Sequence, residues 1–159
     1  MTTTEKTAPD VLADLAAVSR RYRGTFDWPT TVDTSGTRLE LPIGETVDAL
    51  VMRAAFGGEV NALLRMHLVT GPIIGIPGDP ADWIFLTRPR TEMSEKTRED
   101  LLRADVGWKP LGATISLPPS LLPRGRVRWI DRPVAGRPLP PWSTVVAMAR
   151  AALFAGRGW

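Results

Sequence analysis

The sequence predicts a single α+β domain in which helices pack on a mixed or antiparallel sheet. Along the chain, segments alternate as helix, strand pair, helix, strand pair, helix, strand pair and helix. Short turns within each strand pair predict antiparallel hairpins, and the helices between the pairs act as crossovers. A length of 159 residues, of which 43% are hydrophobic and 23% charged, suits one globular domain with a sizeable core.

Apolar spacing and end signals predict four helices. In the first, Leu15 and Val18 share a face and Gly24 ends the segment. Ser94 is an N-cap for the third, in which Lys96 and Asp100 are spaced to pair at i, i+4. The expected helices span residues 9–24, 54–71, 94–105 and 140–156.

Apolar runs bounded by glycine, proline and serine predict the strands. Ser35-Gly36 and Gly78-Asp79-Pro80 are expected turns. The runs expected to form strands are residues 37–41, 47–52, 72–78, 81–89, 111–119 and 126–130. They complete a domain over residues 9–156, flanked by a disordered tail of residues 1–8 and a short tail of residues 157–159.

The ends and the apolar runs of the chain predict a cytoplasmic protein. The first ten residues have no apolar core of the kind a signal peptide carries. No apolar run approaches the roughly 18 to 20 residues that a membrane span needs, so no membrane partner is expected. With no cysteine, the chain has no disulfide, no thiolate zinc site and no cysteine nucleophile.

Candidate catalytic residues are sparse, and we expect no catalytic residue, metal site or cofactor. The single histidine, His67, falls among leucines of a predicted helix, which favours a structural role. Two-metal catalysis needs converging carboxylates, yet no two acidic residues are separated by one residue anywhere in the chain. Asp48 is therefore interpreted as a turn residue or a cap. Gly57-Gly58 lacks the further residues of a phosphate-binding loop and is interpreted as a tight strand-to-helix turn.

Charge is distributed unevenly along the chain. Residues 1–102 hold 11 basic and 15 acidic residues, whereas residues 103–159 hold nine basic and two acidic residues. Within the basic third, the stretch "PRGRVRW" places Arg124, Arg126 and Arg128 at alternate positions. On one strand their side chains would share a face at a spacing of about 6 to 7 Å, which is comparable to that of adjacent phosphates.

These arginines predict a nucleic-acid-binding track. Arg132, Lys109 and Trp129 would lie at its margins, where an aromatic ring beside basic groups can stack on bases. An alternative interpretation is an edge strand whose charges prevent aggregation with other sheets.

Several phrases, in their order, resemble a known family. These are "LPIGETVDALVM", "GGEVNALLRMHLVTGPIIGIPG", "DWIFLTRP", "ISLPPS" and "GRVRWIDRP". Over residues 38–133 the chain resembles small actinobacterial proteins related to the N-terminal domain of bifunctional DNA primase/polymerases. The resemblance implies a primase-polymerase-like α+β fold, whose active members bind nucleotides and template DNA with divalent metals.

The same resemblance implies a relative without catalytic activity. Active members carry a paired acidic motif on a core strand and a histidine on a later strand. Here the corresponding strand carries only Asp48, and His67 lies on a predicted helix, so no catalytic residue is carried over.

Three functions follow as hypotheses. The first is a non-catalytic module that binds DNA or RNA through the basic strand. The second is a protein-interaction module that forms a homodimer or binds a host protein, with the proline-rich "RPLPPW" as a docking element and Trp142 and Trp159 as anchors. The third is an active nucleotidyltransferase with displaced carboxylates, which would depend on Asp48.

Overall fold

Helices and strands alternate as expected in the computed structural model, which describes residues 8–156 and, in the first helix, side chains from Asp14 onward. The helices in this range are α1 (Ala8–Phe26), α2 (Ala54–Met66), α3 (Glu95–Arg103) and α4 (Trp142–Ala155). The strands are β1 (Thr31–Val32), β2 (Leu39–Pro42), β3 (Asp48–Arg53), β4 (Ile73–Ile76), β5 (Asp82–Thr87), β6 (Thr114–Leu117), β7 (Leu121–Leu122), β8 (Gly125–Arg126) and β9 (Arg128–Asp131). The α+β class and the single domain are confirmed.

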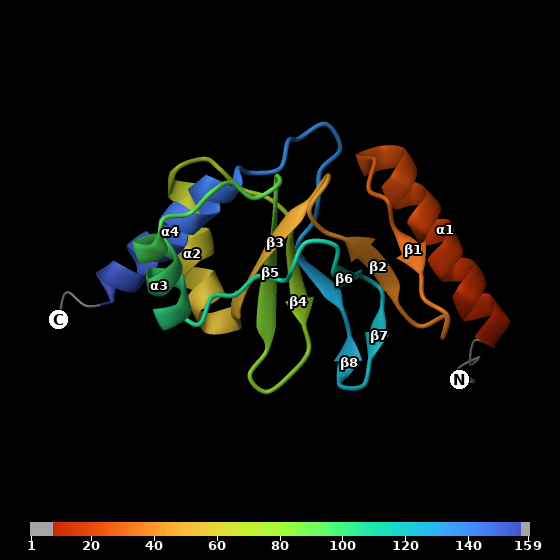
Figure 1. Ribbon diagram of the computed structural model, residues 1–159. Helices are drawn as coiled ribbons and strands as arrows, with labels where there is room; N and C mark the ends of the chain where they lie inside the picture. The colour runs from red at the N-terminus through yellow and green to blue at the C-terminus, as the bar shows by residue number, and fades with distance from the viewer. Residues whose placement is uncertain (1–7, 157–159) are drawn as a thin grey trace.

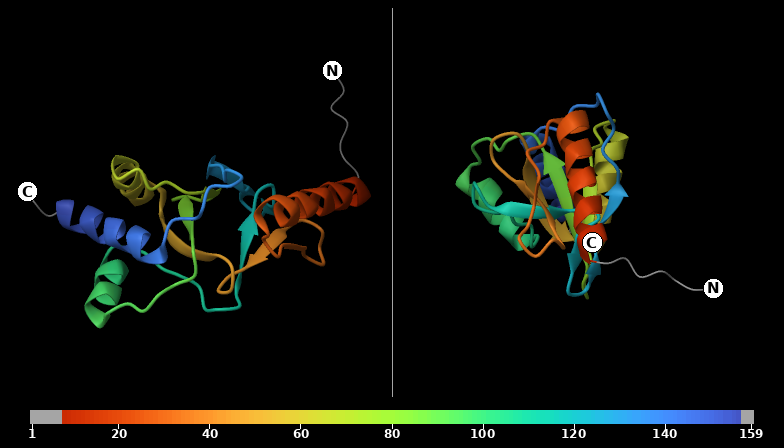
Figure 2. Two further views of the ribbon diagram at one scale, coloured as in Figure 1. Left: turned by 90° about the horizontal axis from the view of Figure 1, so that it is seen from above. Right: turned by 90° about the vertical axis from the view of Figure 1, so that its right-hand side faces the viewer.

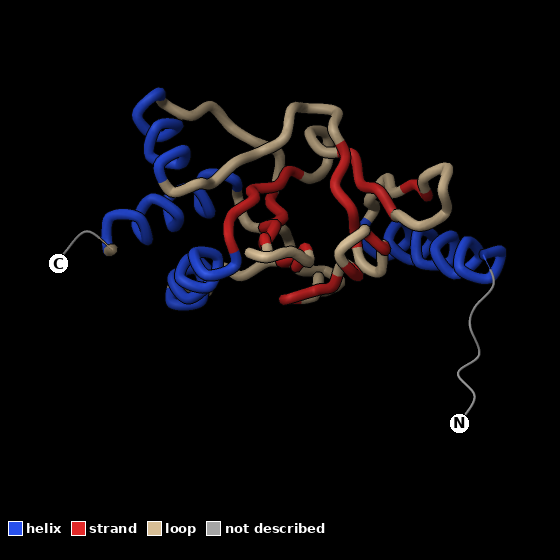
Figure 3. Tube along the Cα trace, turned by 90° about the horizontal axis from the view of Figure 1, so that it is seen from below, coloured by secondary structure: helices blue, strands red, loops and turns tan. Residues whose placement is uncertain are grey.

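The centre of the molecule is an antiparallel four-stranded sheet in the order β3-β5-β4-β9. A second antiparallel sheet, β1-β2-β6, lies on one side of it, and β7 and β8 form a separate hairpin. Figure 1 shows α1 at one end of the molecule, the two sheets in the middle, and α2, α3 and α4 at the other end. The views from above and below show the same order of layers (Figures 2 and 3).

Side chains alternate between the two faces of the central sheet, and each face has its own core. Ala49, Ile74 and Leu86 point into a core shared with α1 and the three-stranded sheet. Leu50 and Phe85 are the chain neighbours of Ala49 and Leu86, and they point into a second core, which the sheet shares with α2, α3 and α4. The period of two that predicted these strands therefore divides their apolar residues between two cores.

The first turn of α2 lies directly against the central sheet. A Cβ atom at Gly57 would lie 2.9 Å from Cε3 of Trp83 on β5, which is closer than side chains approach each other. Helix α2 begins at Ala54, and Gly57 is buried within its first turn. The predicted strand-to-helix turn at Gly57-Gly58 is therefore wrong, because these residues are already helical. The small size of Gly57 permits the close contact.

Most of the predicted elements are confirmed, including the Ser94 cap, whose hydroxyl accepts a hydrogen bond from Thr97 N–H. The predicted strand over residues 126–130 is an exception, because it breaks at Val127 into β8 and β9. The predicted tails lie outside the described residues, apart from Ala8, which begins α1. In the described part of the chain, none of the helices has the length and apolar character needed to cross a membrane.

Candidate functional site

The basic stretch forms the β7–β8 hairpin and then joins the edge of the central sheet as β9. Gly125 has a φ of +140°, a conformation that L-residues with a side chain rarely adopt, and it follows directly on the turn of the hairpin. Val127, between the two strands, is buried in the core that the central sheet shares with α1 and the three-stranded sheet, which we call the α1-side core. Its backbone N–H donates to the carbonyl of Ser120 at 2.9 Å, in register with the pairing of the hairpin. The interrupted strand thereby keeps Arg126 and Arg128 on the face opposite Val127.

Arg124, Arg126 and Arg128 line one hollow of about 410 Å³, which we call the arginine hollow. Three neighbouring strands form the bottom of the hollow. There Gly75 on β4 pairs with Trp83 on β5 on one side and with Arg128 on β9 on the other. A Cβ atom at Gly75 would lie 2.9 Å from Cδ1 of Ile130, so glycine permits Ile130 to pack there, and the stem of Arg128 lies beside the same position. The three arginines therefore lie together as the sequence predicted, although the single continuous strand expected to hold them is divided into β8 and β9.

All three guanidinium groups are available to a ligand. The three residues are exposed, and among the described residues none of them forms an ion pair. Arg126 Nη1 donates one long hydrogen bond of 3.5 Å to the Pro119 carbonyl. No carboxylate lines the hollow, whose aromatic residue is Trp83.

Trp129 does not belong to the arginine hollow. Its side chain packs on the opposite face of β9, in the α1-side core, and its Nε1–H donates to the hydroxyl of Tyr22 at 3.1 Å. Burial raises the pKa of the Tyr22 hydroxyl, and the hydrogen bond from Trp129 acts in the opposite direction. Trp129 therefore lies on the opposite side of β9 from the three arginines, because alternate strand residues face opposite sides of the sheet.

Arg132 and Lys109 lie apart from the three arginines as well. Arg132 follows β9 and lines a hollow with Arg21 and Trp129 against α1. Lys109 lies before β6, where its ammonium group donates to the Thr114 carbonyl at 3.1 Å and its own carbonyl accepts from Arg90. The six predicted contact residues thus lie in three places. The arginine hollow holds three of them, Trp129 and Arg132 lie together near α1, and Lys109 lies before β6.

Asp48 is not the turn residue or cap that the sequence predicted. It is fully buried at the start of β3, and Arg90 binds it in a bidentate pair, with Nε donating to Oδ2 at 2.6 Å and Nη2 to Oδ1 at 3.0 Å. The backbone N–H groups of Ala49 and Arg90 also donate to this carboxylate. Both oxygens are therefore fully engaged within the protein.

His67 lies just beyond the last residue of α2 and is exposed, not packed among the leucines of the helix. Its Nδ1 lies 2.9 Å from the Leu63 carbonyl oxygen, so the tautomer with a proton on Nδ1 caps the helix end. The predicted structural role is consistent with this contact, although the contact is to the backbone.

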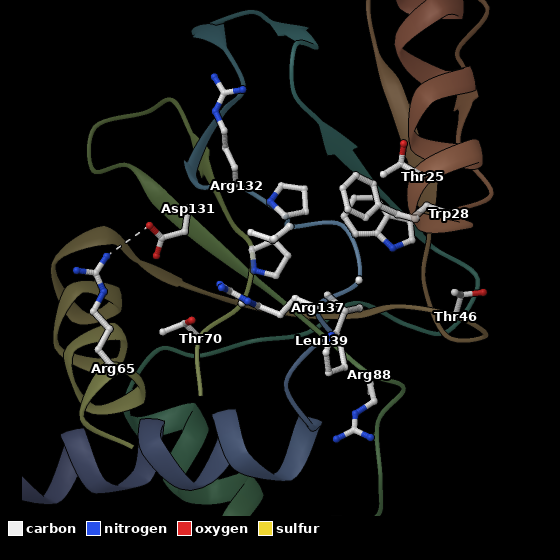
Figure 4. Close-up of a pocket in the computed structure, with 17 residues that line it drawn as sticks. Thr25, Trp28, Thr46, Arg65, Thr70, Arg88, Asp131, Arg132, Arg137 and Leu139 are labelled. Carbon is white, nitrogen blue, oxygen red and sulfur yellow. Dashed lines mark hydrogen bonds and ion pairs between the residues drawn. The ribbon is translucent and has the colours of Figure 1, made fainter. Parts of the chain in front are cut away.

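A second basic concavity, larger than the arginine hollow, lies at the other ends of the strands (Figure 4). We call it the loop pocket because residues 132–139, between β9 and α4, form one wall. Its volume is about 570 Å³, and it shares no lining residue with the arginine hollow. The charged residues that line it are Arg65, Arg88, Asp131, Arg132 and Arg137.

The proline-rich loop that bounds this pocket is held in place by the protein itself. The Arg88 N–H donates to the Pro140 carbonyl at 2.9 Å, and Arg137 N–H donates to the Val134 carbonyl at 3.1 Å. A Cβ atom at Gly71 would lie 2.5 Å from Cδ of Pro140, so glycine is required for this approach. Trp142, at the end of "RPLPPW", is 1% exposed and is not a free anchor, and Trp159 lies outside the described residues.

Sequence reasoning missed Trp83, Arg65 and Arg88 as residues of basic concavities. The turn at residues 78–80 could have placed Trp83 opposite Gly75, because a short turn determines the register of a hairpin. No sequence signal joins Arg65 on α2 to Arg88 after β5. No protein-family model matches the chain, and comparisons with curated proteins and with solved structures find no match either.

Proposed function

We propose that this chain is a non-catalytic nucleic-acid-binding module and that the arginine hollow contacts the phosphate backbone. The observation that carries the proposal is the convergence of Arg124, Arg126 and Arg128 in a hollow lined by no carboxylate. Guanidinium groups bind phosphate through forked hydrogen bonds and release counterions from the nucleic acid. Trp83, partly exposed beside them, supplies an aromatic surface for a base.

Protection of a sheet edge is the competing explanation for these charges. Strand β9 is indeed an edge strand of the central sheet, so it accounts for a charge at Arg128. Arg124 and Arg126 belong to the separate hairpin, where they protect no edge of that sheet, yet they line the same hollow. A shared ligand explains all three positions together.

The non-catalytic part of the proposal rests on Asp48. An active nucleotidyltransferase needs carboxylates that are free to bind metal ions, whereas the oxygens of Asp48 are engaged by Arg90 and by two backbone N–H groups. Kinship with the primase-polymerase domains is a proposal that rests on the order of the short motifs in residues 38–133.

The test is fluorescence anisotropy with labelled single-stranded and double-stranded DNA and RNA across a salt series, for the native chain and for Arg126→Glu/Arg128→Glu. We expect affinity for at least one of these nucleic acids to fall steeply with salt. Two lost phosphate contacts would reduce the slope of log affinity against log salt by roughly 1.4 to 1.8.

The matched control is Arg20→Glu/Arg103→Glu, which changes the net charge by the same amount at exposed positions that line neither concavity. It should lower affinity far less than the variant in the hollow. Equal losses in the two variants would show that only net charge matters, and the assignment of the hollow would then be wrong.

Self-association is a second candidate function, favoured by the apolar side chains at the end of α2. Leu68 is 92% exposed and Met66 is 75% exposed, and only His67 separates them in the chain. Light scattering at several protein concentrations would detect a homodimer. A dimer that dissociates in Met66→Ser/Leu68→Ser, with DNA binding unchanged, would assign that surface to self-association.

A further inference from the structure

Four arginines from three separate parts of the chain line the loop pocket. Arg65 comes from α2, Arg88 follows β5, and Arg132 and Arg137 lie in the segment between β9 and α4. Figure 4 shows these side chains around the pocket, with the Arg65–Asp131 ion pair on one side and the ring of Trp28 on the other. Segments far apart in sequence therefore contribute arginines to the lining of one cavity.

The charge of the pocket is only partly neutralised within the protein. Among the described residues, Asp131 is the one carboxylate that lines the pocket, and it already accepts hydrogen bonds from Asn61 at 3.2 Å and from Arg65 at 3.5 Å. In the described part of the chain, Arg88, Arg132 and Arg137 form no ion pair. Three positive charges thus remain for an anion to balance.

The number of unbalanced charges indicates the kind of anion. One phosphate monoester carries about −1.5 to −2 charges at pH 7, which would leave part of the positive charge uncompensated. Two linked phosphoryl groups match the three arginines more closely. Side chains of Thr25, Thr46 and Thr70 also line the pocket, and hydroxyl groups are suitable donors to phosphoryl oxygens.

The size and the walls of the pocket indicate an organic ligand. A volume of about 570 Å³ lies in the range of small-molecule pockets, roughly 300 to 1,000 Å³, and is far larger than an inorganic ion requires. Apolar side chains form the remaining walls; they are Phe26, Trp28, Pro72, Pro133, Val134 and Leu139. They can cover the apolar or ring portion of a ligand while the arginines bind its charged end.

We propose that the loop pocket binds a small organic molecule that carries two or more phosphoryl groups. The guanidinium groups of Arg88 and Arg137 contact the phosphoryl oxygens, and the apolar walls cover the organic portion. The pocket is formed before the ligand arrives, because the Arg88–Pro140 hydrogen bond and the packing of Pro140 on Gly71 hold the loop. This function does not depend on nucleic-acid binding, since the two concavities share no residue.

The test is isothermal titration calorimetry with four probes: pyrophosphate, inorganic phosphate, citrate and adenosine diphosphate. We expect one site per chain, with pyrophosphate binding about 10-fold or more tightly than phosphate or citrate. Adenosine diphosphate should bind more tightly than pyrophosphate because its rings reach the apolar walls. Equal affinities for pyrophosphate and citrate would show that the pocket does not select phosphoryl groups. Equal affinities for pyrophosphate and adenosine diphosphate would show that the apolar walls do not bind an organic portion.

Substitutions at Arg137, Arg88 and Arg126 locate the site. Loss of one charged hydrogen-bond donor should weaken pyrophosphate binding about 10-fold or more in Arg137→Ala, and Arg137→Lys should restore part of it. Arg126→Ala, in the arginine hollow, should leave pyrophosphate binding unchanged while weakening nucleic-acid binding. An unchanged affinity in both Arg137→Ala and Arg88→Ala would overturn the proposal, even if the arginine hollow binds DNA as proposed above. Exposure of Arg88 and Arg137 makes both variants compatible with folding.

Discussion

Arginines play two different roles in the two halves of this molecule. At the helical end, Arg90 and Arg150 each bind a fully buried carboxylate, Asp48 and Asp100 respectively, at 2.6 to 3.1 Å. At the β7–β8 hairpin and the adjoining edge strand, Arg124, Arg126 and Arg128 form no ion pair within the described chain. The same residue type thus stabilises the fold at one place and remains free for a ligand at another.

The difference follows from the cost of burying a charge. A buried carboxylate without a partner is strongly unfavourable, so Asp48 requires Arg90 in the folded state. An exposed guanidinium is hydrated and loses little when it has no partner. An unpaired exposed arginine contributes little to stability, so the three arginines of the hollow add little to the stability of the fold.

The largest expected effect is on the buried pair. Asp48→Ala should lower the free energy of unfolding by about 3 kcal/mol or more, because Arg90 would be left partly buried without its counter-ion. Urea denaturation measures this change. Asp79→Ala, at an exposed turn, is the control and should change stability by no more than about 0.5 kcal/mol. A similar small loss in both variants would show that the pair is not structural.

Acid should weaken the second buried pair. Burial acts to raise the pKa of Asp100, but hydrogen bonds from Arg150 and Lys96 outweigh it and hold the pKa below the ordinary value. The resulting stabilisation is fully present above about pH 4 and is lost as the pH falls through the lowered pKa of the folded state. Melting temperatures of the native chain and Asp100→Asn should differ at pH 7, and the difference should shrink as the pH falls below about 4. A constant difference would contradict this role.

A smaller loss of stability is expected at Trp129, whose role differs from that of the neighbouring arginines. Trp129→Phe removes the hydrogen bond to Tyr22 and should cost about 1 kcal/mol of unfolding free energy. Because the indole faces the core, affinity for nucleic acid should be unchanged. Denaturation and anisotropy on the same variant measure both quantities, and a loss of affinity without a loss of stability would return Trp129 to the binding surface.

The smallest expected change in stability is at Arg128. Arg128→Gln retains a stem that covers Gly75 and should alter the unfolding free energy by no more than about 0.5 kcal/mol. The salt slope of nucleic-acid binding should nevertheless fall by roughly 0.7 to 0.9. A marked loss of stability with no change in slope would assign Arg128 to edge protection.

Local signals predicted the elements of the fold well, because they act within a few residues. Ser94 caps α3 as its position before an amphipathic segment indicated, and Lys96 pairs with Asp100 one turn later at 3.2 Å. Strict period-two alternation places Trp129 on the face of β9 opposite Arg128, and in the structure it packs against the core on the α1 side.

Long-range pairing decided what local signals could not. No spacing in the sequence shows that β9 pairs with β4, which puts Arg128 beside Gly75 and in reach of Trp83. Likewise, Asp48 and Arg90 are far apart in sequence, and only the β3–β5 pairing brings them together. The arginines of the loop pocket likewise come from α2, from the end of β5 and from the segment after β9, which lie far apart in sequence.

The sequence by itself determined the α+β class, the alternation of helices and hairpins, and the concentration of positive charge in the last third of the chain. These properties depend on composition and on interactions between near neighbours, which a single sequence displays. The tertiary structure decided which arginines are paired with buried carboxylates, which converge in the arginine hollow, and which surround the loop pocket. Those outcomes depend on strand order and on which segments pack together, and both arise from the burial of apolar surface by the whole chain.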